Sequence, residues 1–304
     1  MLILLIPYLL LAMLLLAAWL FVRRKRVAGA VLLAVVLVVN CFVHCFAVHP
    51  FRHRDGGLKV MSWNIQGTGD PGTARAVADM VERLDPDVFC AVEVWHRTSK
   101  VLDSLLRNHC GYILAGAAGE IVCYSKLHLG EVLPVENAGG GLRLGFSVDG
   151  GDTLNMTVCH LASNNYDAET ARIAPIDSVS TSSELQAYLR NITAAGQQRE
   201  SQAESLCEGA GLSHPTIILG DMNDLWSSAA LRVFDRKGFR DAWWDGGFGY
   251  GSTIHHPLSF RIDHILYSDR LRLRSVGRVK ACGLSDHDAL VASFDLNQPD
   301  GEEP

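Results

Sequence analysis

The first 48 residues contain two long apolar segments separated by a short basic turn. Residues 2–22 are interrupted only by Pro7 and Tyr8, and at about 1.5 Å per helical residue they span roughly 30 Å, the hydrocarbon thickness of a bilayer. Residues 27–48 form a second run of similar length, and the four basic residues 23–26 between the runs are too few for anything but a tight turn. The pattern therefore predicts a hairpin of two transmembrane helices, 2–22 and 27–48.

A cleavable signal peptide is the competing interpretation of the first run. No basic region precedes this run, however, and the apolar stretch is longer than that of such a peptide. The positive-inside rule places the basic turn in the cytoplasm, although Arg52, Arg54 and Lys59 weaken the asymmetry. We therefore expect a two-helix protein of the cell membrane, with the domain after residue 50 on the periplasmic or extracellular side.

Polar residues within the second apolar run need a partner inside a membrane. Asn40 and His44 are one helical turn apart, and with Cys41 and Cys45 nearby they resemble a metal site. The simpler interpretation uses Tyr8, which lies at a similar depth on the first helix. We therefore expect Tyr8 to form hydrogen bonds with Asn40 and His44 across the hairpin.

After a linker at 49–58, alternating strand and helix patterns begin. Residues 59–65 and 87–94 have the apolar character of buried strands. Two amphipathic helices are predicted from the spacing of apolar residues between 77 and 84 and between 101 and 106. Further strands are predicted at 121–124, 142–148, 154–161, 216–219, 262–267 and 289–296. Many strands with few helices between the middle ones indicate a mixed sheet or two packed sheets.

One segment interrupts this pattern. Residues 163–211 are polar and are interpreted as an insert containing a helix from about Ser183 to Leu206. Arg172, Arg190 and Arg199 alternate there with acidic residues, a pattern typical of a solvated helix face. The chain ends in an acidic tail, residues 298–304.

The distribution of charged residues changes near residue 51, where the apolar segments end. Of 304 residues, the first 51 contain no Asp or Glu, and their only Lys and Arg residues form the turn. The rest therefore holds 23 basic and 33 acidic residues, a net charge of −10. This acidity excludes a protein that coats nucleic acid nonspecifically, because neutralising phosphates requires clustered Lys and Arg.

Chemically reactive side chains follow the predicted strands. Eight residues lie at strand ends or in the loops just after them: Asn64, Glu93, His160, Asp221, Asn223, Asp263, Asp286 and His287. Such positions converge at one edge of an α/β sandwich. Carboxylates with Asn make a hard oxygen site that suits Mg²⁺ or Mn²⁺ better than zinc. A metal at such a site offsets charge on phosphoryl oxygens while a carboxylate activates water, so the pattern predicts phosphoester hydrolysis.

Six motifs, SWNIQG, EVW, CHLAS, GDMND, RIDHIL and SDHDAL, carry a resemblance to a known family. In order and spacing they resemble the endonuclease/exonuclease/phosphatase superfamily, with the DNase-I-like fold, here as a membrane-anchored bacterial-type member. The resemblance covers residues 59–297. It implies an α+β four-layer α/β/β/α sandwich, preceded in this chain by the transmembrane hairpin.

The resemblance also implies roles for a metal and a water molecule. Glu93, with Asn64 beside it, would hold Mg²⁺ or Mn²⁺, and Asp286 would complete or flank that site. Asp221 would orient or deprotonate the attacking water. Asn223 would form a hydrogen bond to the water or to a phosphoryl oxygen.

Two histidines receive roles in the same way. Asp263 would accept a hydrogen bond from His287 and keep its ring cationic, so that His287 stabilises charge on phosphorus. His160 would bind the phosphate or help the leaving group. Many family members set an acidic or tyrosine partner beside this histidine, and Glu120 and Tyr124 are the candidates here.

The predicted transmembrane hairpin and the negative net charge together indicate a class of substrate. A linker of about ten residues reaches at most roughly 35 Å, so the site works near the lipid surface. We expect a phosphatase or phosphodiesterase acting on lipid-linked or envelope phosphates; nucleic acid is not favoured by the charge. An outward-facing nuclease is the alternative, and a catalytically inactive, membrane-anchored binding module is a third interpretation.

An aromatic segment close in sequence to Asp263 has two interpretations. Residues 241–257 are rich in Gly and aromatic side chains, which is typical of a packed loop. Alternatively, the segment forms a substrate platform in which a base or lipid chain contacts Trp243, Trp244, Phe248 or Tyr250.

Overall fold

The computed structural model describes most of the chain. The described residues are 2–49, 56–67, 70–134, 141–148, 153–163, 182–208, 210, 213–255 and 259–296. The predicted acidic tail, residues 50–55 of the predicted linker and residues 164–181 of the predicted insert lie outside them.

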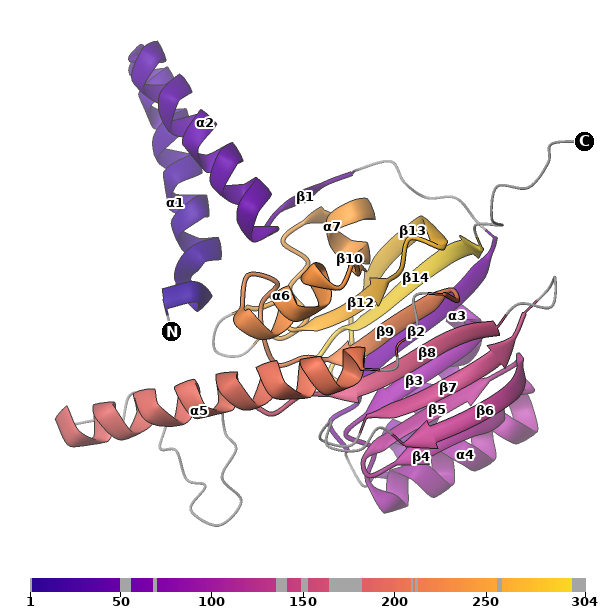
Figure 1. The fold of residues 1–304 in the computed structure, drawn as a ribbon. Helices are drawn as coiled ribbons and strands as arrows, with labels where there is room; N and C mark the ends of the chain where they lie inside the picture. Colours follow the sequence, from indigo (N-terminus) through magenta and orange to yellow (C-terminus); the bar gives the residue numbers. More distant parts are fainter. Residues whose placement is uncertain are drawn as a thin grey trace, which may run out of the picture.

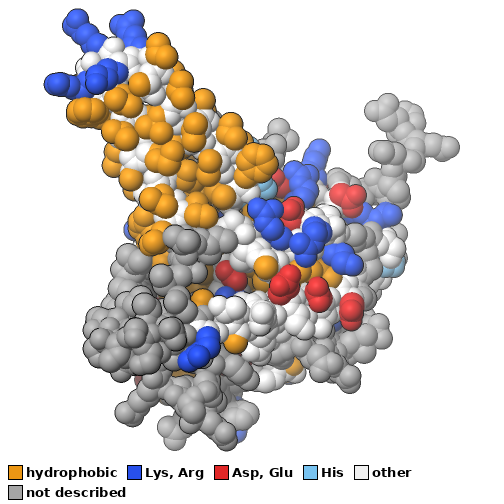
Figure 2. All heavy atoms as spheres, turned by 60° about the vertical axis from the view of Figure 1, so that its left-hand side comes forward, with side chains coloured by type: hydrophobic (Ala, Val, Ile, Leu, Met, Phe, Trp, Pro, Cys, Tyr) orange, Lys and Arg blue, Asp and Glu red, His pale blue; other side chains and the backbone are white. Residues whose placement is uncertain are grey.

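The N-terminal hairpin stands out from the body of the molecule (Figure 1). It consists of α1 (Leu2–Val22) and α2 (Arg26–Val43), both long and apolar enough to cross a membrane by length and composition. Figure 2 shows an apolar column with the Lys and Arg side chains at its far tip. Most large side chains of the column are exposed, Val22 to 79 %, as expected for surface that contacts lipid.

The second helix ends five residues earlier than the sequence predicts. Asn40 ends it by accepting a hydrogen bond from the Phe46 amide (2.8 Å) and donating one to the Phe46 carbonyl (2.9 Å). Its partner is therefore local backbone, and the predicted bond between Tyr8 and Asn40 is wrong. His44 has the left-handed conformation at the helix end. The predicted bond from Tyr8 to His44 is also wrong, because the Tyr8 hydroxyl bonds to the body of the molecule instead.

The chain after α2 joins the hairpin to the body. Strand β1 (Ala47–Val48) pairs with β11 (Phe248–Gly249), and the Tyr8 hydroxyl exchanges hydrogen bonds with the backbone of Ser259 at 3.0 and 2.8 Å. The His44 ring stacks on Trp244 with ring centroids 4.2 Å apart. We call this contact region the anchor junction; it seats the hairpin directly on the body.

The body contains two six-stranded mixed sheets. The first has the order β10 (Arg240–Asp241), β12 (Asp263–Tyr267), β9 (Thr216–Asp221), β8 (Thr153–His160), β7 (Leu142–Ser147) and β6 (His128–Pro134). The second has the order β13 (Leu271–Val279), β14 (Ala289–Leu296), β2 (Leu58–Asn64), β3 (Val88–Val92), β5 (Ile121–Ser125) and β4 (Ile113–Ala118). Apolar side chains from both sheets form the central core between them.

Helices cover the outer faces and complete four layers. Helices α3 (Pro71–Leu84) and α4 (His96–Cys110) share a core with the second sheet, whereas α5 (Ser182–Cys207) and α6 (Ala229–Arg236) share one with the first. A short helix, α7 (Ala242–Gly246), lies near the anchor junction. The α+β four-layer sandwich predicted from the sequence is therefore confirmed.

Candidate functional site

Three candidate residues lie side by side at one end of the first sheet. The parallel pairing of β8 with β9 sets His160 opposite Asp221, and the antiparallel pairing of β9 with β12 sets Asp263 opposite Asp221. Gly220 permits this close approach, because a Cβ there would lie 1.9 Å from the Cys159 carbonyl oxygen, at a φ of +142°. Strand register therefore aligns His160, Asp221 and Asp263.

The second sheet contributes Asn64 and Glu93 to the same cluster. Asn64 ends β2, and Glu93 follows β3 with a φ of +56°. Asn64 Nδ2 lies 2.9 Å from a Glu93 carboxylate oxygen and 3.0 Å from Asp221 Oδ2, so it bridges the two sheets. Asn223, at φ +50°, and Gln66, at φ +47°, share the uncommon backbone conformation of Glu93. Such strain is typical of functional sites held by their surroundings.

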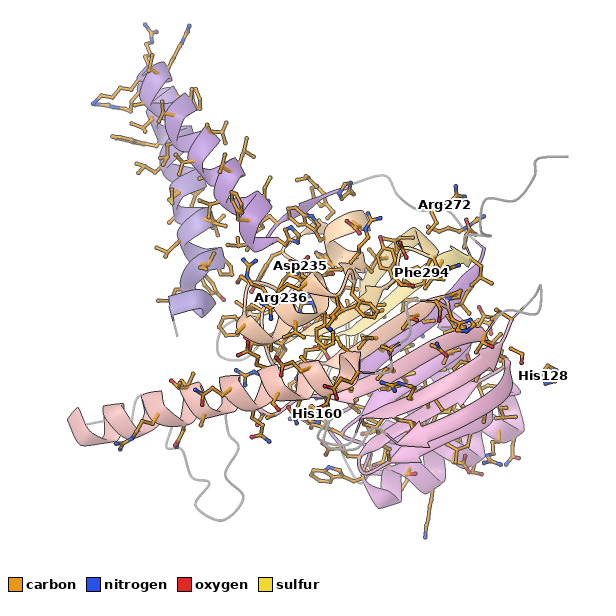
Figure 3. All side chains as sticks on the ribbon, viewed as in Figure 1. His128, His160, Asp235, Arg236, Arg272 and Phe294 are labelled. Atoms are coloured by element: carbon orange, nitrogen blue, oxygen red, sulfur yellow. The ribbon has the colours of Figure 1, made fainter. Side chains whose placement is uncertain are left out.

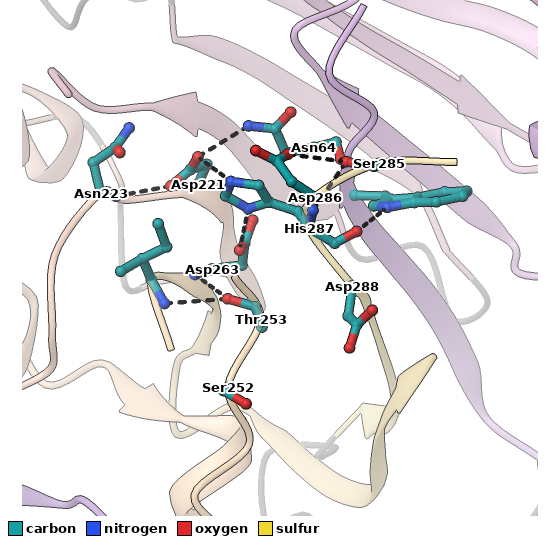
Figure 4. Close-up of polar contacts among 12 residues, drawn as sticks. Asn64, Asp221, Asn223, Ser252, Thr253, Asp263, Ser285, Asp286, His287 and Asp288 are labelled. Carbon is teal, nitrogen blue, oxygen red and sulfur yellow. Dashed lines mark hydrogen bonds and ion pairs between the residues drawn. The ribbon is translucent and has the colours of Figure 1, made fainter. Parts of the chain in front are cut away.

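His287 is held on one side of Asp221 (Figure 4). Its Nδ1 donates to Asp263 Oδ2 at 2.8 Å, while its Nε2 lies 3.8 Å from Asp221 Oδ2. Burial lowers the pKa of His287, but the charge and hydrogen bond of Asp263, with Asp221 and Asp286, outweigh it and raise the pKa to about 10. The ring is therefore a cation at neutral pH, and its free edge faces Asp221.

His160 occupies the other side of Asp221, close to α5 (Figure 3). Its Nδ1 donates to Glu120 at 2.5 Å, and its Nε2 lies 3.6 Å from Glu93 and 3.8 Å from Asp221. Burial opposes protonation here too, but Glu120, Asp221 and Glu93 raise the pKa of His160 to about 9. Of the two candidate partners, Glu120 thus contacts His160, whereas Tyr124 is buried in the core beneath α3 and α4.

Asp221 is the centre of the cluster. Burial and the neighbouring Asp263 carboxylate raise its pKa to about 6, while the two histidines and the Asn223 amide favour its charged form. Asn223 donates its backbone amide to Asp221 Oδ1 (2.9 Å), and its side chain donates to the Leu161 carbonyl (2.9 Å). A buried carboxylate with a pKa near neutrality and two cationic rings beside it suits proton transfer.

The donor set fits a divalent cation. Glu93, His160 and Asp221 offer ligand atoms within 4.8 Å of one another, and Asn64 lies between the two carboxylates. A second group, Asp221, Asp263 and His287, meets the same criterion. Carboxylate oxygens dominate both groups, and the Oδ1 atom of Asp263 is buried without a hydrogen-bond partner among the described residues. These are hard ligands that suit Mg²⁺ or Mn²⁺.

Asp286 lies slightly apart from these carboxylates. It is exposed, and its carboxylate accepts a hydrogen bond from the Gln66 side chain at 3.1 Å. Gln66 in turn donates its backbone amide to Asn64 (3.0 Å). Ser285 fixes the turn by donating to the Asn64 carbonyl at 2.7 Å. Asp286 thus flanks the cluster through Gln66, a residue that sequence reasoning did not single out.

Helix α5 supports the loops that follow β8 and β9. Arg199 is only 4 % exposed and pairs with Asp224 at 2.8 Å, three residues after Asp221. Arg199 also donates to the Ala162 carbonyl, and Gln202 accepts from the Ala162 amide, both at 2.9 Å, just after His160. The predicted solvated face is therefore wrong for Arg199, because this part of the helix packs on the loops that follow two strands of the site.

The aromatic segment has a structural role away from the cluster. Trp244 stacks on His44, Tyr250 packs on Phe46 with ring centroids 5.8 Å apart, and Trp243 is buried against the β1–β11 pair. The described contacts of Trp243, Trp244 and Tyr250 are thus at the anchor junction. The packed-loop interpretation fits them better than the substrate platform does.

A model of the endonuclease/exonuclease/phosphatase family matches residues 61–287 of the chain. The chain belongs to this family. Members of the family are metal-dependent phosphoesterases or nucleases, and the cluster of carboxylates and histidines described above lies within the matched region. The chain is therefore a metal-dependent phosphoesterase with a DNase-I-like fold.

Solved structures share the fold at low sequence identity. A mannosyl-6-phosphatase of Bacteroides thetaiotaomicron is 17 % identical with a TM-score of 0.58, over 78 % of this chain and 99 % of that one. D. rerio TDP2 with a single-strand DNA product is 16 % identical (TM-score 0.59; 79 % and 100 % covered), and an AP endonuclease of Archaeoglobus fulgidus is 17 % identical (0.57; 79 % and 100 %). No curated protein matches the chain. These likenesses show the fold and leave the substrate open.

Proposed function

We propose that the protein is a membrane-tethered, Mg²⁺-dependent phosphoesterase that acts on lipid-linked or envelope phosphates. The observation that carries this proposal is the anchor junction. The hairpin does not hang on a free linker; it pairs with the body through β1 and β11 and stacks on it through His44 and Trp244. A body seated in this way on a membrane anchor stays beside the lipid surface.

The residues of the cluster divide the chemistry between them. Glu93, with Asn64 beside it and Asp286 flanking the site, would hold Mg²⁺, which would offset charge on the phosphoryl oxygens. We assign to Asp221 the removal of a proton from the attacking water, because its raised pKa makes it a better base than an exposed Asp. Asn223 would orient that water.

The two histidines act as cations toward the phosphoryl group. Asp263 holds the proton of His287 at Nδ1, so that Nε2 can donate to an oxygen on which charge builds. Glu120 holds His160 in the same way, and His160 can donate to the phosphate or to the leaving oxygen. In-line attack on phosphorus by water, with both rings donating, needs no covalent intermediate.

A substrate panel tests this function. The full-length protein in lipid nanodiscs should hydrolyse a prenyl phosphate or a phospholipid phosphate with Mg²⁺, and EDTA should reduce the rate to background. Plasmid DNA should be cut at least about 100-fold more slowly, because a domain at −10 repels a polyanion. Efficient DNA cleavage would overturn the lipid assignment and establish the nuclease alternative. TDP2 and the AP endonuclease, whose folds resemble that of this chain, are the precedents for that alternative. No hydrolysis of any phosphoester would favour the inactive binding module.

We also propose that the body lies outside the cytoplasm, in the periplasmic or extracellular space. The basic turn Arg23–Arg26 is at the tip of the hairpin farthest from the body (Figure 2), which is the side that the positive-inside rule retains in the cytoplasm. Protease added to cells with a permeable outer boundary and an intact inner membrane should digest the body. Full protection under these conditions, with digestion only after membrane lysis, would reverse the orientation.

A further inference from the structure

A narrow pocket lies at the anchor junction, between the hairpin and the body. Ile6, Pro7 and Val43 line it from the hairpin, and Leu225, Trp226 and Arg261 line it from the body. Val43 is the last residue of α2, so the pocket lies where the apolar helices end. This is the depth at which the glycerol and phosphate groups of a bilayer meet its hydrocarbon.

Two nitrogen atoms of the pocket residues are buried without a hydrogen-bond partner among the described residues. One is Nε of Arg261, a side chain that is only 3 % exposed, and the other is Nδ1 of His44. A buried N–H group without a partner costs free energy, and native proteins rarely leave one. Arg261 Nε always carries a hydrogen and therefore indicates an acceptor atom that is supplied from outside the chain, and His44 Nδ1 can donate to the same acceptor when it carries the ring hydrogen.

The rest of Arg261 is already occupied. Its guanidinium pairs with the buried Asp241, contacts His264 and donates to the His44 carbonyl at 3.2 Å. The ion pair with Asp241 balances its charge, and none of these contacts uses Nε. The site thus offers fixed hydrogen-bond donors rather than a mobile surface charge.

We propose that this pocket binds the headgroup phosphate of a membrane phospholipid. A phosphate oxygen would accept from Arg261 Nε and from the His44 ring, while the glycerol and the start of an acyl chain contact Ile6, Pro7 and Val43. The lipid would act as a structural ligand of the junction, separate from the catalytic cluster. The inference rests on the proposed membrane placement and not on the proposed substrate.

Native mass spectrometry of the full-length, delipidated protein in detergent tests the site. The probes are dioleoylphosphatidylglycerol and dioleoylglycerol, which have the same chains but differ in the phosphate. We expect half-saturation by the phospholipid at a concentration about tenfold or more below that of the diacylglycerol, the effect of one or two hydrogen bonds to a charged group. Equal binding of the two lipids by the wild-type protein would overturn the proposal without any variant. Displacement of the phospholipid by excess inorganic phosphate would assign the pocket to free phosphate instead.

Two conservative variants localise the binding. Arg261→Lys keeps a cation beside Asp241 but removes Nε, and His44→Phe keeps the ring stacked on Trp244 but removes Nδ1. Each should lose the preference for the phosphorylated lipid, whereas Arg272→Lys, an exposed arginine paired with Asp295, should keep it. Unchanged preference in both folded variants would overturn the site. Phosphoesterase activity, measured in parallel, tests the proposed function independently.

Discussion

Replacing Asp221 with Asn is expected to lower kcat by at least about 10³-fold and, at the same time, to stabilise the metal-free protein at pH 8. The loss of rate follows from the position of Asp221. Its carboxylate lies 3.8 Å from both His160 and His287 and accepts from Asn64, so the same oxygen faces every part of the cluster. An amide in that place can neither accept a proton from water nor bind a divalent cation well.

The gain in stability follows from the raised pKa. Because folding raises the pKa of Asp221 from its ordinary value to about 6, the folded state holds the charged form less well than the unfolded state does. The resulting loss of free energy of unfolding is absent at pH values below the pKa of Asp221 in the unfolded state. It grows as the pH rises and is complete above the pKa in the folded state. Asn removes it, so the free energy of unfolding at pH 8 should rise by about 1–3 kcal/mol.

Thermal unfolding in EDTA at two pH values measures this effect. At pH 8 the variant should melt a few degrees above the wild type, at roughly 2–4 °C per kcal/mol for a domain of this size, and the difference should vanish near pH 4. Asp288→Asn is the matched control. Asp288 is also buried (5 % exposed) but pairs with Arg278 and His255, so its loss should lower stability and leave kcat within a few-fold. A variant that is both inactive and less stable at pH 8 would contradict the account.

Buried segments were predictable from the sequence, and sheet edges were not. The predicted strands 59–65, 87–94 and 154–161 correspond to β2, β3 and β8, each of which has a hydrogen-bonded strand on both sides and buries most of its residues. The sequence analysis missed β4, β6 and β13, and all three lie at an edge of their sheet. An edge strand mixes apolar residues with polar or small ones, as the exposed Arg272 and the half-buried Arg274 and Arg278 of β13 illustrate, so its apolar pattern is weak.

The candidate site was predictable for a related reason. Polar residues that end buried apolar strands stand out against their surroundings, and strand register then brings His160, Asp221 and Asp263 into one row. Glu120 was harder to choose, since it lies in a turn before β5 and only the fold carries it to His160. The aromatic segment left two interpretations open because a packed loop and a loop that binds substrate have the same composition. The contacts of Trp243, Trp244 and Tyr250 at the junction favour the packed loop.

The pH dependence of the Asp263→Asn variant should differ from that of the wild type at high pH. In the wild type we expect the rate to rise as Asp221 loses its proton, with a midpoint at or below about 6 because a bound cation favours the carboxylate. The rate should then fall near pH 9 as His160 becomes neutral, before His287 does near pH 10. The profile is therefore a broad bell.

Asp263 is the largest influence that keeps His287 protonated against the cost of burial. Without that carboxylate, burial lowers the pKa of His287 with less to oppose it, so the ring should lose its proton more than about one pH unit earlier and therefore before His160 does. At pH 8 the kcat of the variant should be about 10²–10³-fold lower than that of the wild type. Its rate should also begin to fall at a lower alkaline pH than the wild-type rate does. The loss should be smaller near pH 6, where the ring can still be protonated.

Rates measured from pH 5 to 10 with saturating Mg²⁺ separate this role from a structural one. Simple damage to the fold would lower kcat by the same factor at every pH, whereas loss of the proton on His287 changes the factor with pH. Asp288→Asn alters the residue next to His287 without touching its ring, so its basic limb should coincide with that of the wild type. Parallel profiles for Asp263→Asn and the wild type would show that Asp263 does not hold the proton of His287 during turnover. The rate at high pH would then depend on His160 and Glu120 alone.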